Sequence, residues 1–455
     1  MDKKELFEKM PIGKALATLA VPTIISQLIS LVYNMVDAFF IGRTGNSYMM
    51  AATTLTLTMT MMSVAFSNLF GVGGGSLIAR LMGASRDDET KQVSAFSVWG
   101  AVAIAFCYAM FMGILLNPVL RFLGASDATI GYARQYTILV IVIGSIPTIL
   151  SLTLAHILRN AGNAGKASMG LSGGGILNMF LDPLFMFVLL PKGNEVIGAA
   201  LATLISNVLA CAYLLFAFHQ TSLSMKIKDA IKISPNNRKN VFAVGIPSAI
   251  LTGLFDVANI CVNMISASHS DLVLAAMGIV MKVERVPNAI NIGICQGMLP
   301  MVAYNYASGN RDRMQKTIKT ARTWGLLIAF ASMLLFQLLA KPLTGIFLST
   351  KAEDTALVTL TYAALFLRIR CLASPVQFIN YSSSYSMQAI GDGKRTMLHA
   401  FVREVVFYIP LMFILDKIFG EIGLASALPA GEALGALFAM YLLRQSIQWN
   451  DQRMA

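Results

Sequence analysis

The feature that most constrains this chain is a series of apolar runs, each long enough to cross a membrane, separated by short charged clusters. The hydrocarbon core of a bilayer is about 30 Å thick, and an α-helix crosses it with about 20 residues. Only 13% of the 455 residues are charged and 56% are hydrophobic, whereas a soluble domain carries about 25% charged residues. The runs are too long and too unalternated for the strands of a transmembrane barrel. The sequence therefore predicts an all-α, polytopic membrane protein.

The apolar runs predict twelve transmembrane spans. Their bounds are 15–41, 51–79, 94–117, 131–156, 167–190, 195–218, 241–267, 272–306, 317–347, 355–380, 396–418 and 421–445. Of the 35 Lys and Arg residues, 23 lie in loops and span ends on the side of the N-terminus, 7 lie on the other side and 5 lie within spans. Because positive loops stay in the cytoplasm, both termini are predicted to be cytoplasmic, in a multi-pass protein of the plasma (bacterial inner) membrane.

The two halves of the chain match at one constant offset in residue number. The matched pairs include a proline, an asparagine and a Trp-Gly dipeptide: Pro22 with Pro247, Asn34 with Asn259, and Trp99-Gly100 with Trp324-Gly325. Several such pairs on one offset indicate an internal duplication. Since each copy holds an even number of spans, both copies face the same way, and the axis that relates them should lie along the membrane normal.

This duplication predicts two lobes and a connection between them. Residues 1–218 form the first lobe and residues 241–455 the second. The stretch 219–240, HQTSLSMKIKDAIKISPNNRKN, is polar, basic and broken by a proline, and is predicted to be a cytoplasmic linker.

Several motifs give the chain a family resemblance. They are the first span with its FIGRTG ending (40–45), GVGGGSLIARLMGASR (71–86), GICQGMLPMVAYNYASGN (293–310), and NMFLDPLF (178–185) followed by IGAALATLISN (197–207). With its two six-span lobes, the sequence resembles the multidrug and toxic compound extrusion (MATE) family over nearly its whole length. It is most similar to the bacterial branch that includes the DinF and MepA types, because of the Asn–x3–Asp on the fifth span. The resemblance implies secondary transport coupled to protons or sodium ions.

Four polar residues of the first lobe are predicted to meet at one depth. Asp37 lies near the end of the first span, and Asp182 lies in the second half of the fifth; both spans run outward. Thr203 lies in the first half of the sixth span, which runs inward. Asn178 shares a helix face with Asp182, because their spacing is i, i+4. Two carboxylates in a poorly solvated pocket do not both stay ionised easily, so this site can take up and release a proton.

Carboxylate, amide and hydroxyl oxygens are also the ligands that a small cation such as Na⁺ prefers, so the coupling ion stays open between H⁺ and Na⁺. The family's sodium sites in this lobe use the positions that match Asp37, Asn178, Asp182, Ala199 (through its carbonyl) and Thr203. This chain departs from that pattern on the fourth span, where a polar or acidic position is Ala155, beside His156. The departure favours protons. Beyond that possible Na⁺, no metal and no cofactor is expected.

The second lobe lacks this pair of acids and carries mixed charges instead. At the offset of the repeat, Asp37 corresponds to Val262, and Asp182 to an apolar position near Phe407. The candidate substrate or cavity residues are four charged residues of the second lobe, Asp256, Lys282, Glu284 and Arg285, together with Asn34 of the first span. Glu284 or Asp256 could pair with Lys282 and Arg285. Two interpretations of these charges therefore stay open, internal salt bridges and contacts with substrate. Further charges of this lobe are Arg403, Glu404 and Glu432.

A switch and a function follow from these features. Pro22 precedes Asp37 on the same span, and proline makes a ready bending point, so Pro22 is the candidate hinge. No Walker motif is present, so transport is expected to be secondary. The predicted function is an antiporter, not an enzyme, that exports amphipathic or cationic small molecules from a monomer embedded in lipid, without nucleic acid. The alternatives are a flippase for lipid-linked oligosaccharides, or a channel.

Overall fold

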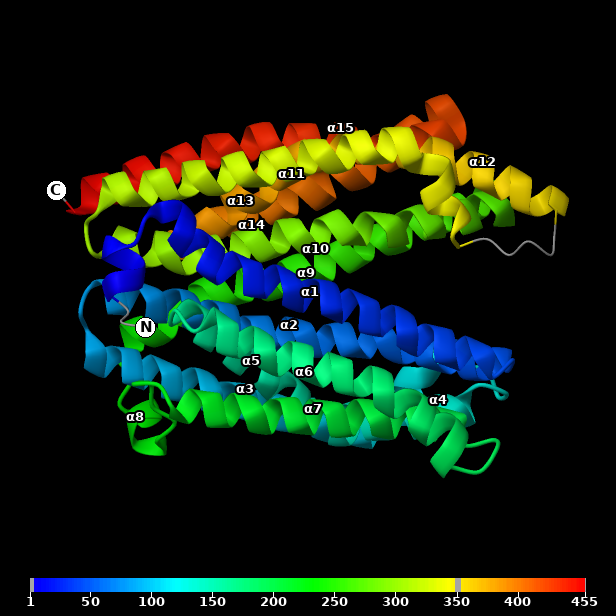
Figure 1. The fold of residues 1–455 in the computed structure, drawn as a ribbon, viewed down its shortest axis with the longest axis horizontal. Coiled ribbons are helices and arrows are strands. Elements are labelled where there is room, and N and C mark those ends of the chain that lie inside the picture. Colours follow the sequence, from blue (N-terminus) through cyan, green and yellow to red (C-terminus); the bar gives the residue numbers. More distant parts are fainter. Residues whose placement is uncertain (1–3, 348–352, 455) are drawn as a thin grey trace.

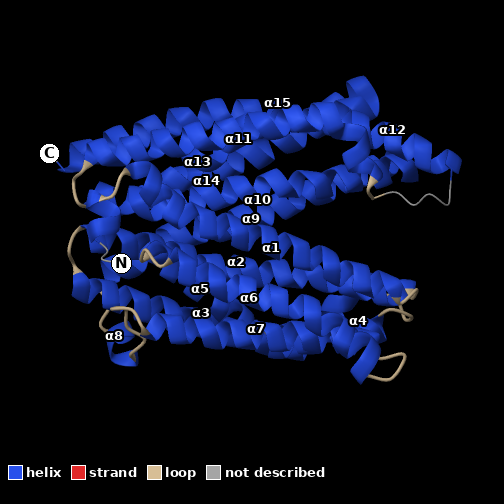
Figure 2. Cartoon of the chain, viewed as in Figure 1, coloured by secondary structure: helices blue, strands red, loops and turns tan. Residues whose placement is uncertain are grey.

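The computed structural model describes residues 4–347 and 353–454. Throughout this part of the chain the secondary structure is helical, with short loops and no strand (Figure 2). The helices form two bundles that lie one above the other in Figure 1, and the two ends of the chain lie at the same end of the molecule. The short helix α8 (Ile227–Ile231) lies at that end too. This end is called the terminal end below.

The first lobe contains six membrane-length segments, preceded by a short helix, η1 (Glu5–Lys9). In chain order they are α1 (Ile12–Arg43), α2 (Ser47–Gly83), α3 (Asp87–Phe122), a fourth segment made of α4 (Ile130–Thr137), η2 (Ile138–Ile143) and α5 (Ser145–Asn160), a fifth made of α6 (Ala164–Pro183) and η3 (Leu184–Leu189), and α7 (Glu195–His219). The fourth segment bends by 49° before α5.

The second lobe repeats this order after the linker. Its segments are α9 (Pro235–His269), α10 (Asp271–Ala307), α11 (Arg311–Gly345), a tenth made of α12 (Glu353–Arg370), η4 (Cys371–Ala373) and α13 (Ser374–Ile390), an eleventh made of α14 (Gly393–Phe401), η5 (Val402–Tyr408) and the start of α15 (Ile409–Met454), and a twelfth made of the rest of α15. Gly420, with φ 60°, separates the last two within α15.

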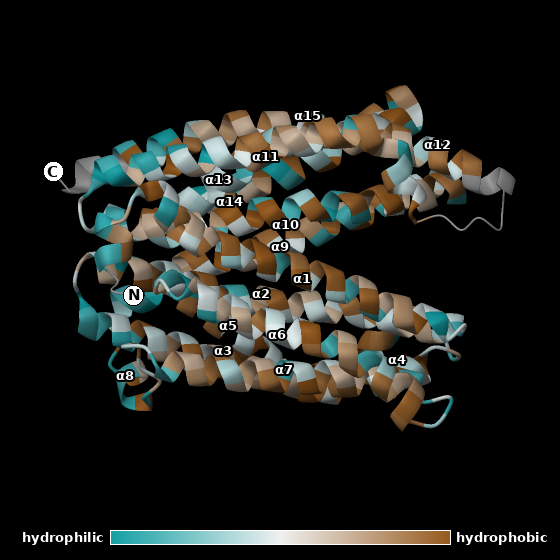
Figure 3. Ribbon diagram, viewed as in Figure 1, coloured by the Kyte–Doolittle hydropathy of each residue, from teal (hydrophilic) through white to brown (hydrophobic). Residues whose placement is uncertain are grey.

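The twelve-span, two-lobe fold predicted from the sequence is confirmed. By length and composition, nine helical stretches of the described chain can cross a membrane, and ten with the bent fourth segment. One more span is α10, the eighth segment in chain order, which is 37 residues long but carries Lys282, Glu284 and Arg285. The last span is gained because Gly393–Gln448, one of the nine stretches, is divided at Gly420 into the eleventh and twelfth segments. Hydrophobic residues predominate along the middle of the helices (Figure 3).

The predicted end of the tenth span, residue 380, is too early, because the helix continues to Ile390. The sequence there is serine-rich, which resembles a loop. In the structure these serines are buried, and their hydroxyls find partners inside the protein. Ser386 donates to the carbonyl of Ser382 at 2.7 Å, and Ser384 bonds to His399 Nδ1 at 2.8 Å. A helix can therefore continue through a polar stretch when neighbouring helices cover it.

Local irregularities of the helices repeat between the lobes. The third and ninth segments each contain one residue with non-helical dihedral angles, Leu115 (φ −105°, ψ 19°) and Leu339 (φ −109°, ψ 22°). Each lies shortly before a proline, Pro118 and Pro342. A proline removes a helical hydrogen bond and clashes with the preceding turn, which explains both kinks. The duplicated sequence therefore folds into duplicated distortions.

The lobes touch chiefly through two equivalent pairs of helices, α1 with α10 and α2 with α9, and also through α2 with α10. Small residues bring the backbones together, because a side chain on Gly297 would collide with Ala20 and one on Gly245 with the carbonyl of Leu69. Hydrogen bonds between these helices, such as Gln27–Gln296 and Asn68–Thr252, lie in the half nearer the terminal end. Beyond that half the two lobes diverge toward the opposite end (Figure 1).

Candidate functional site

Three of the predicted first-lobe residues are joined by hydrogen bonds, one within α6 and one from α6 to α7. The side-chain amide of Asn178 donates to Asp182 Oδ1 at 3.1 Å and reaches Thr203 Oγ1 at 3.5 Å. Asn178 is 3% exposed and Asp182 is fully buried. The i, i+4 spacing of Asn178 and Asp182 places both side chains on one face of α6. The sequence prediction that these groups lie together agrees with this geometry.

Asp37 of α1 approaches the same place from the neighbouring helix. It lies close enough to Asp182 for the two carboxylates to interact electrostatically. Asp37 Oδ1 and Asp182 Oδ2 are both buried and have no hydrogen-bond partner among the described residues. Neither carboxylate forms an ion pair in that part of the chain. The first lobe therefore holds two acids with spare buried acceptor atoms, Asp182 fully buried and Asp37 partly buried, and no compensating cation among the described residues.

Two tyrosines beside these acids were not anticipated from the sequence. Tyr33 of α1 and Tyr136 of α4 both interact electrostatically with Asp37 and Asp182, and Tyr136 also reaches Thr203. Their phenolic groups are the natural hydrogen-bond donors for a carboxylate in an apolar setting. Tyr33 sits one turn before Asp37 on α1, so the i, i+4 spacing was a signal that could have identified it.

The remaining positions of the predicted ion site are apolar. Ala199 is fully buried on α7, and Ala155 is 1% exposed on α5. Ala155 therefore supplies only a methyl group on the fourth segment. Orphaned oxygens on two carboxylates, with an amide and a hydroxyl beside them, suit a proton or a small cation.

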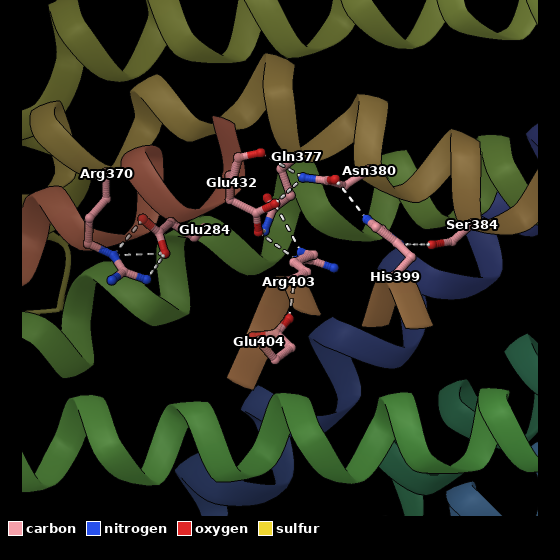
Figure 4. Close-up of polar contacts among 9 residues, drawn as sticks. All are labelled: Glu284, Arg370, Gln377, Asn380, Ser384, His399, Arg403, Glu404 and Glu432. Atoms are coloured by element: carbon pink, nitrogen blue, oxygen red, sulfur yellow. Dashed lines mark hydrogen bonds and ion pairs between the residues drawn. The ribbon is translucent and has the colours of Figure 1, made fainter. Parts of the chain in front are cut away.

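The second lobe has a buried polar network of a different kind (Figure 4). Arg403 of η5 forms a bidentate ion pair with Glu432 of α15, with Nε–Oε2 at 3.0 Å and Nη2–Oε1 at 2.5 Å. Gln377 and Asn380 of α13 also donate to the Glu432 carboxylate, at 3.2 and 2.6 Å. Glu404 lies farther from the guanidinium, at 3.5 Å. The guanidinium thus neutralises Glu432, and every oxygen of that carboxylate has a partner.

The offset of the internal repeat places this network at the position equivalent to the first-lobe site. Arg403 corresponds to Asn178, and Glu432 corresponds to Asn207 on α7. The eleventh and twelfth segments pack together as the fifth and sixth do. Where the first lobe has an amide beside two unneutralised acids, the second has a guanidinium bound to an acid. Comparing Asn178 with its counterpart in the sequence would have identified Arg403 as the key residue of this lobe.

The candidate second-lobe charges divide into a paired and an unpaired set. Glu284 of α10 pairs with Arg370 at the break of the tenth segment, with Nη2–Oε2 at 2.9 Å (Figure 4). Its partner is therefore neither Lys282 nor Arg285, contrary to one of the two interpretations left open from the sequence. The side chains of Lys282 and Arg285 are exposed and form no ion pair within 4.0 Å in the described chain. Asp256 is half-buried and interacts electrostatically with Arg285.

Asn34 and Pro22 lie on α1 with the first-lobe acid. The side chain of Asn34 is exposed, and its amide donates to the carbonyl of Ser30 on its own helix at 2.6 Å. Its amide is thus directed to its own helix and not to Asp37. Helix α1 continues without a break across Pro22, from Ile12 to Arg43.

Comparisons with known proteins agree with this architecture. A model of the MatE family matches residues 22–184 and 247–414. The two matched regions begin at Pro22 and Pro247, which are paired prolines of the internal repeat. The chain is 30% identical to the multidrug export protein MepA of Staphylococcus saprophyticus, over 97% of this chain and 96% of that protein. It is 31% identical to MepA of Staphylococcus haemolyticus, over 96% and 94% of the two chains.

Solved structures share the fold. One, described as the outward-facing conformation of a multidrug resistance MATE family transporter of the MOP superfamily, superposes with a TM-score of 0.92 at 21% identity, over 99% of each chain.

Proposed function

We propose that this chain, which belongs to the MatE family, is a secondary antiporter that exports amphipathic, cationic small molecules in exchange for protons. The name of its relatives, multidrug export protein, supports the export of drug-like molecules. The observation that carries the coupling is the pair of orphaned oxygens, Asp37 Oδ1 and Asp182 Oδ2, buried in the first lobe. A buried acceptor without a partner is costly, and a proton removes that cost.

The proton acts by changing what Asp37 and Asp182 require from their surroundings. When both are ionised they repel each other and need donors such as the amide of Asn178 and the two tyrosines. When one is protonated, the pair shares the proton and α1 can pack in a second arrangement. A ligand shifts a conformational equilibrium only through its different affinity for the two states. The proton therefore favours the arrangement in which the two carboxylates are closest.

The transport step is a rocking of the two lobes. With the termini in the cytoplasm, the lobes pack together on the cytoplasmic side and diverge on the external side, which is an outward-facing arrangement. Protonation from outside then favours the return toward an inward-facing state, where the proton leaves and substrate binds. Pro22 is the proposed bending point of α1; it lies within the packed half of the helix, before Asp37 in the sequence.

Protons are preferred to Na⁺ as the coupling ion because the site offers few neutral oxygen ligands. Ala155 brings no side-chain oxygen, so a sodium ion would depend on Asp37, Asn178, Asp182, Thr203 and the carbonyl of Ala199. Two competing functions predict different behaviour. A flippase would move lipid-linked oligosaccharides and not soluble drugs, and a channel would conduct without saturation.

Uptake into everted membrane vesicles tests this proposal. An antiporter gives saturable accumulation of a lipophilic cation such as ethidium that depends on an imposed pH gradient and collapses with a protonophore. Accumulation that persists without any pH gradient but follows a sodium gradient would replace H⁺ by Na⁺. Flux that rises linearly with substrate concentration would contradict the antiporter and support a channel.

A further inference from the structure

A pocket of about 340 Å³ opens between α11 and α15 of the second lobe, near the terminal end. Three of its lining residues are cationic: Lys319 and Arg322 of α11, and Arg444 of α15. The rest are polar or apolar, Gln315, Ile318, Thr323, Leu326, Met440, Leu443 and Ile447, and none is acidic. The pocket thus combines a positive rim with an apolar wall.

The equivalent groove of the first lobe is filled by the chain itself. At the offset of the repeat, Lys319 corresponds to Ser94. The Ser94 hydroxyl donates to the carbonyl of Ser224 in the linker and accepts from the Ser224 amide, both at 3.0 Å. The indole of Trp99 donates to the carbonyl of Met225 at 2.9 Å. The linker therefore lies against α3, beside the end of α7.

In the second lobe α15 continues as a helix to Met454, past the position equivalent to the end of α7 at His219, and the groove residues have changed. Ser94, Ser97 and His219 of the first lobe are replaced at equivalent positions by Lys319, Arg322 and Arg444. Ser94 and Ser97 are fully buried, whereas Lys319 and Arg444 are exposed. The repeated fold thus leaves a groove that the first lobe fills with backbone and the second lines with positive charge.

The surroundings of the pocket indicate what fills it. From the pocket toward the membrane centre, α11 and α15 present exposed leucines, of which Leu327 is 64% and Leu437 is 63% exposed. Polar residues concentrate at the terminal end of these helices (Figure 3). A molecule that fits has an anionic head at the membrane surface and apolar tails along the helices. Basic pockets between helices on the cytoplasmic side have this character.

We propose that the groove between α11 and α15 binds an anionic phospholipid of the cytoplasmic leaflet, with its phosphate beside Lys319, Arg322 and Arg444. The placement in the cytoplasmic leaflet rests on the predicted orientation of the termini. Arg322 is the anchoring residue, because its guanidinium also donates to Ser382 and Ser383 of α13 at 3.3 and 2.8 Å. A bound lipid therefore bridges the ninth, tenth and twelfth segments at the end where the lobes pack together.

Lipid binding to the purified full-length protein tests this proposal without substrate or gradient, so its outcome is independent of the transport function. Native mass spectrometry compares phosphatidylglycerol with phosphatidylethanolamine of the same acyl chains. The test variant is Lys319→Gln/Arg444→Gln, which keeps Arg322 and its hydrogen bonds. The control is Lys228→Gln/Lys239→Gln, which removes two exposed positive charges from the terminal end outside the pocket.

We expect phosphatidylglycerol to bind the wild type and the control more tightly than phosphatidylethanolamine does. The test variant should lose affinity by roughly thirtyfold, because each cation near the surface contributes about fivefold. An unchanged affinity in the test variant, or equal affinity for the two lipids, would overturn the proposal. Displacement of the lipid by millimolar inorganic phosphate would also overturn it, because the site would then recognise a soluble anion.

Discussion

The two lobes present the same fold with opposite electrostatic solutions at equivalent positions. In the first lobe, Asn178 lies beside Asp37 and Asp182, which have buried oxygens without partners among the described residues. In the second, Arg403 takes the place of Asn178 and neutralises Glu432 at 2.5 Å. A guanidinium stays charged at every physiological pH, so it acts as a permanently bound cation. The comparison teaches that one copy of a duplicated site can hold a permanent positive charge, while the other copy is left free to bind and release a proton.

Removing one first-lobe acid should have the largest effect. We expect Asp182→Asn to reduce export driven by a pH gradient to the background of vesicles without the protein, because the remaining carboxylate no longer has a second acid with which to share a proton. Drug uptake into everted vesicles, at matched protein levels, measures this. Export near the wild-type level would show that the second lobe, or another group, can couple transport by itself.

Breaking the ion pair between Arg403 and Glu432 should mainly lower the stability of the folded protein. Arg403→Gln leaves Glu432 buried without its cation, which costs about 3–5 kcal/mol when one partner of a buried pair is removed. Thermal unfolding in detergent should show a clear decrease in melting temperature. The double variant Arg403→Gln/Glu432→Gln removes both charges and should recover most of the loss. Equal destabilisation by the single and the double variant would mean that packing, not charge compensation, is the role of Arg403.

Pro22 offers a test of asymmetry in the helices, because Pro247 is its counterpart in the second lobe. Pro22→Ala should slow export several-fold, since the substitution restores a backbone hydrogen bond and makes the helix that carries Asp37 harder to bend. The dependence of export on external pH should keep its shape. The matched variant Pro247→Ala, on a helix that has Val262 in place of Asp37, should slow export less. Equal effects of the two variants would mean that the two prolines contribute equally to transport, so that Pro22 has no special role as a hinge.

The smallest effect is expected at Glu404. Its carboxylate lies 3.5 Å from Arg403, whose charge Glu432 already matches. Glu404→Gln should reduce export by about twofold or less, because a group that binds a proton equally in both arrangements shifts no equilibrium. Initial rates of drug uptake at two external pH values check this. A loss as large as that of Asp182→Asn would break the proposed division between the lobes.

The fold was readable from the sequence because hydrophobic runs and a constant offset are strong signals. Apolar length predicted the spans, and the repeat predicted their pairing. The tenth span was cut short at residue 380, since hydropathy does not reveal that the serines after it are covered by neighbouring helices.

The first-lobe site was readable in part, for a different reason. The i, i+4 spacing of Asn178 and Asp182, and similar depths of Asp37 and Thr203, placed four residues together. The partners of Glu284 and Glu432 were not readable, because ion pairs between distant helices depend on which faces meet. Arg370 and Arg403 come from helices 86 and 29 residues away from those acids in sequence.

The central claim, that protons bind and leave only in the first lobe, is tested most directly by proton release from purified protein on addition of substrate. In weakly buffered detergent solution with a pH indicator, the wild type and Glu404→Gln should release protons in the same amount per substrate bound. Asp37→Asn should still bind substrate but release none. Proton release by Asp37→Asn equal to the wild type, or its loss in Glu404→Gln, would contradict the account.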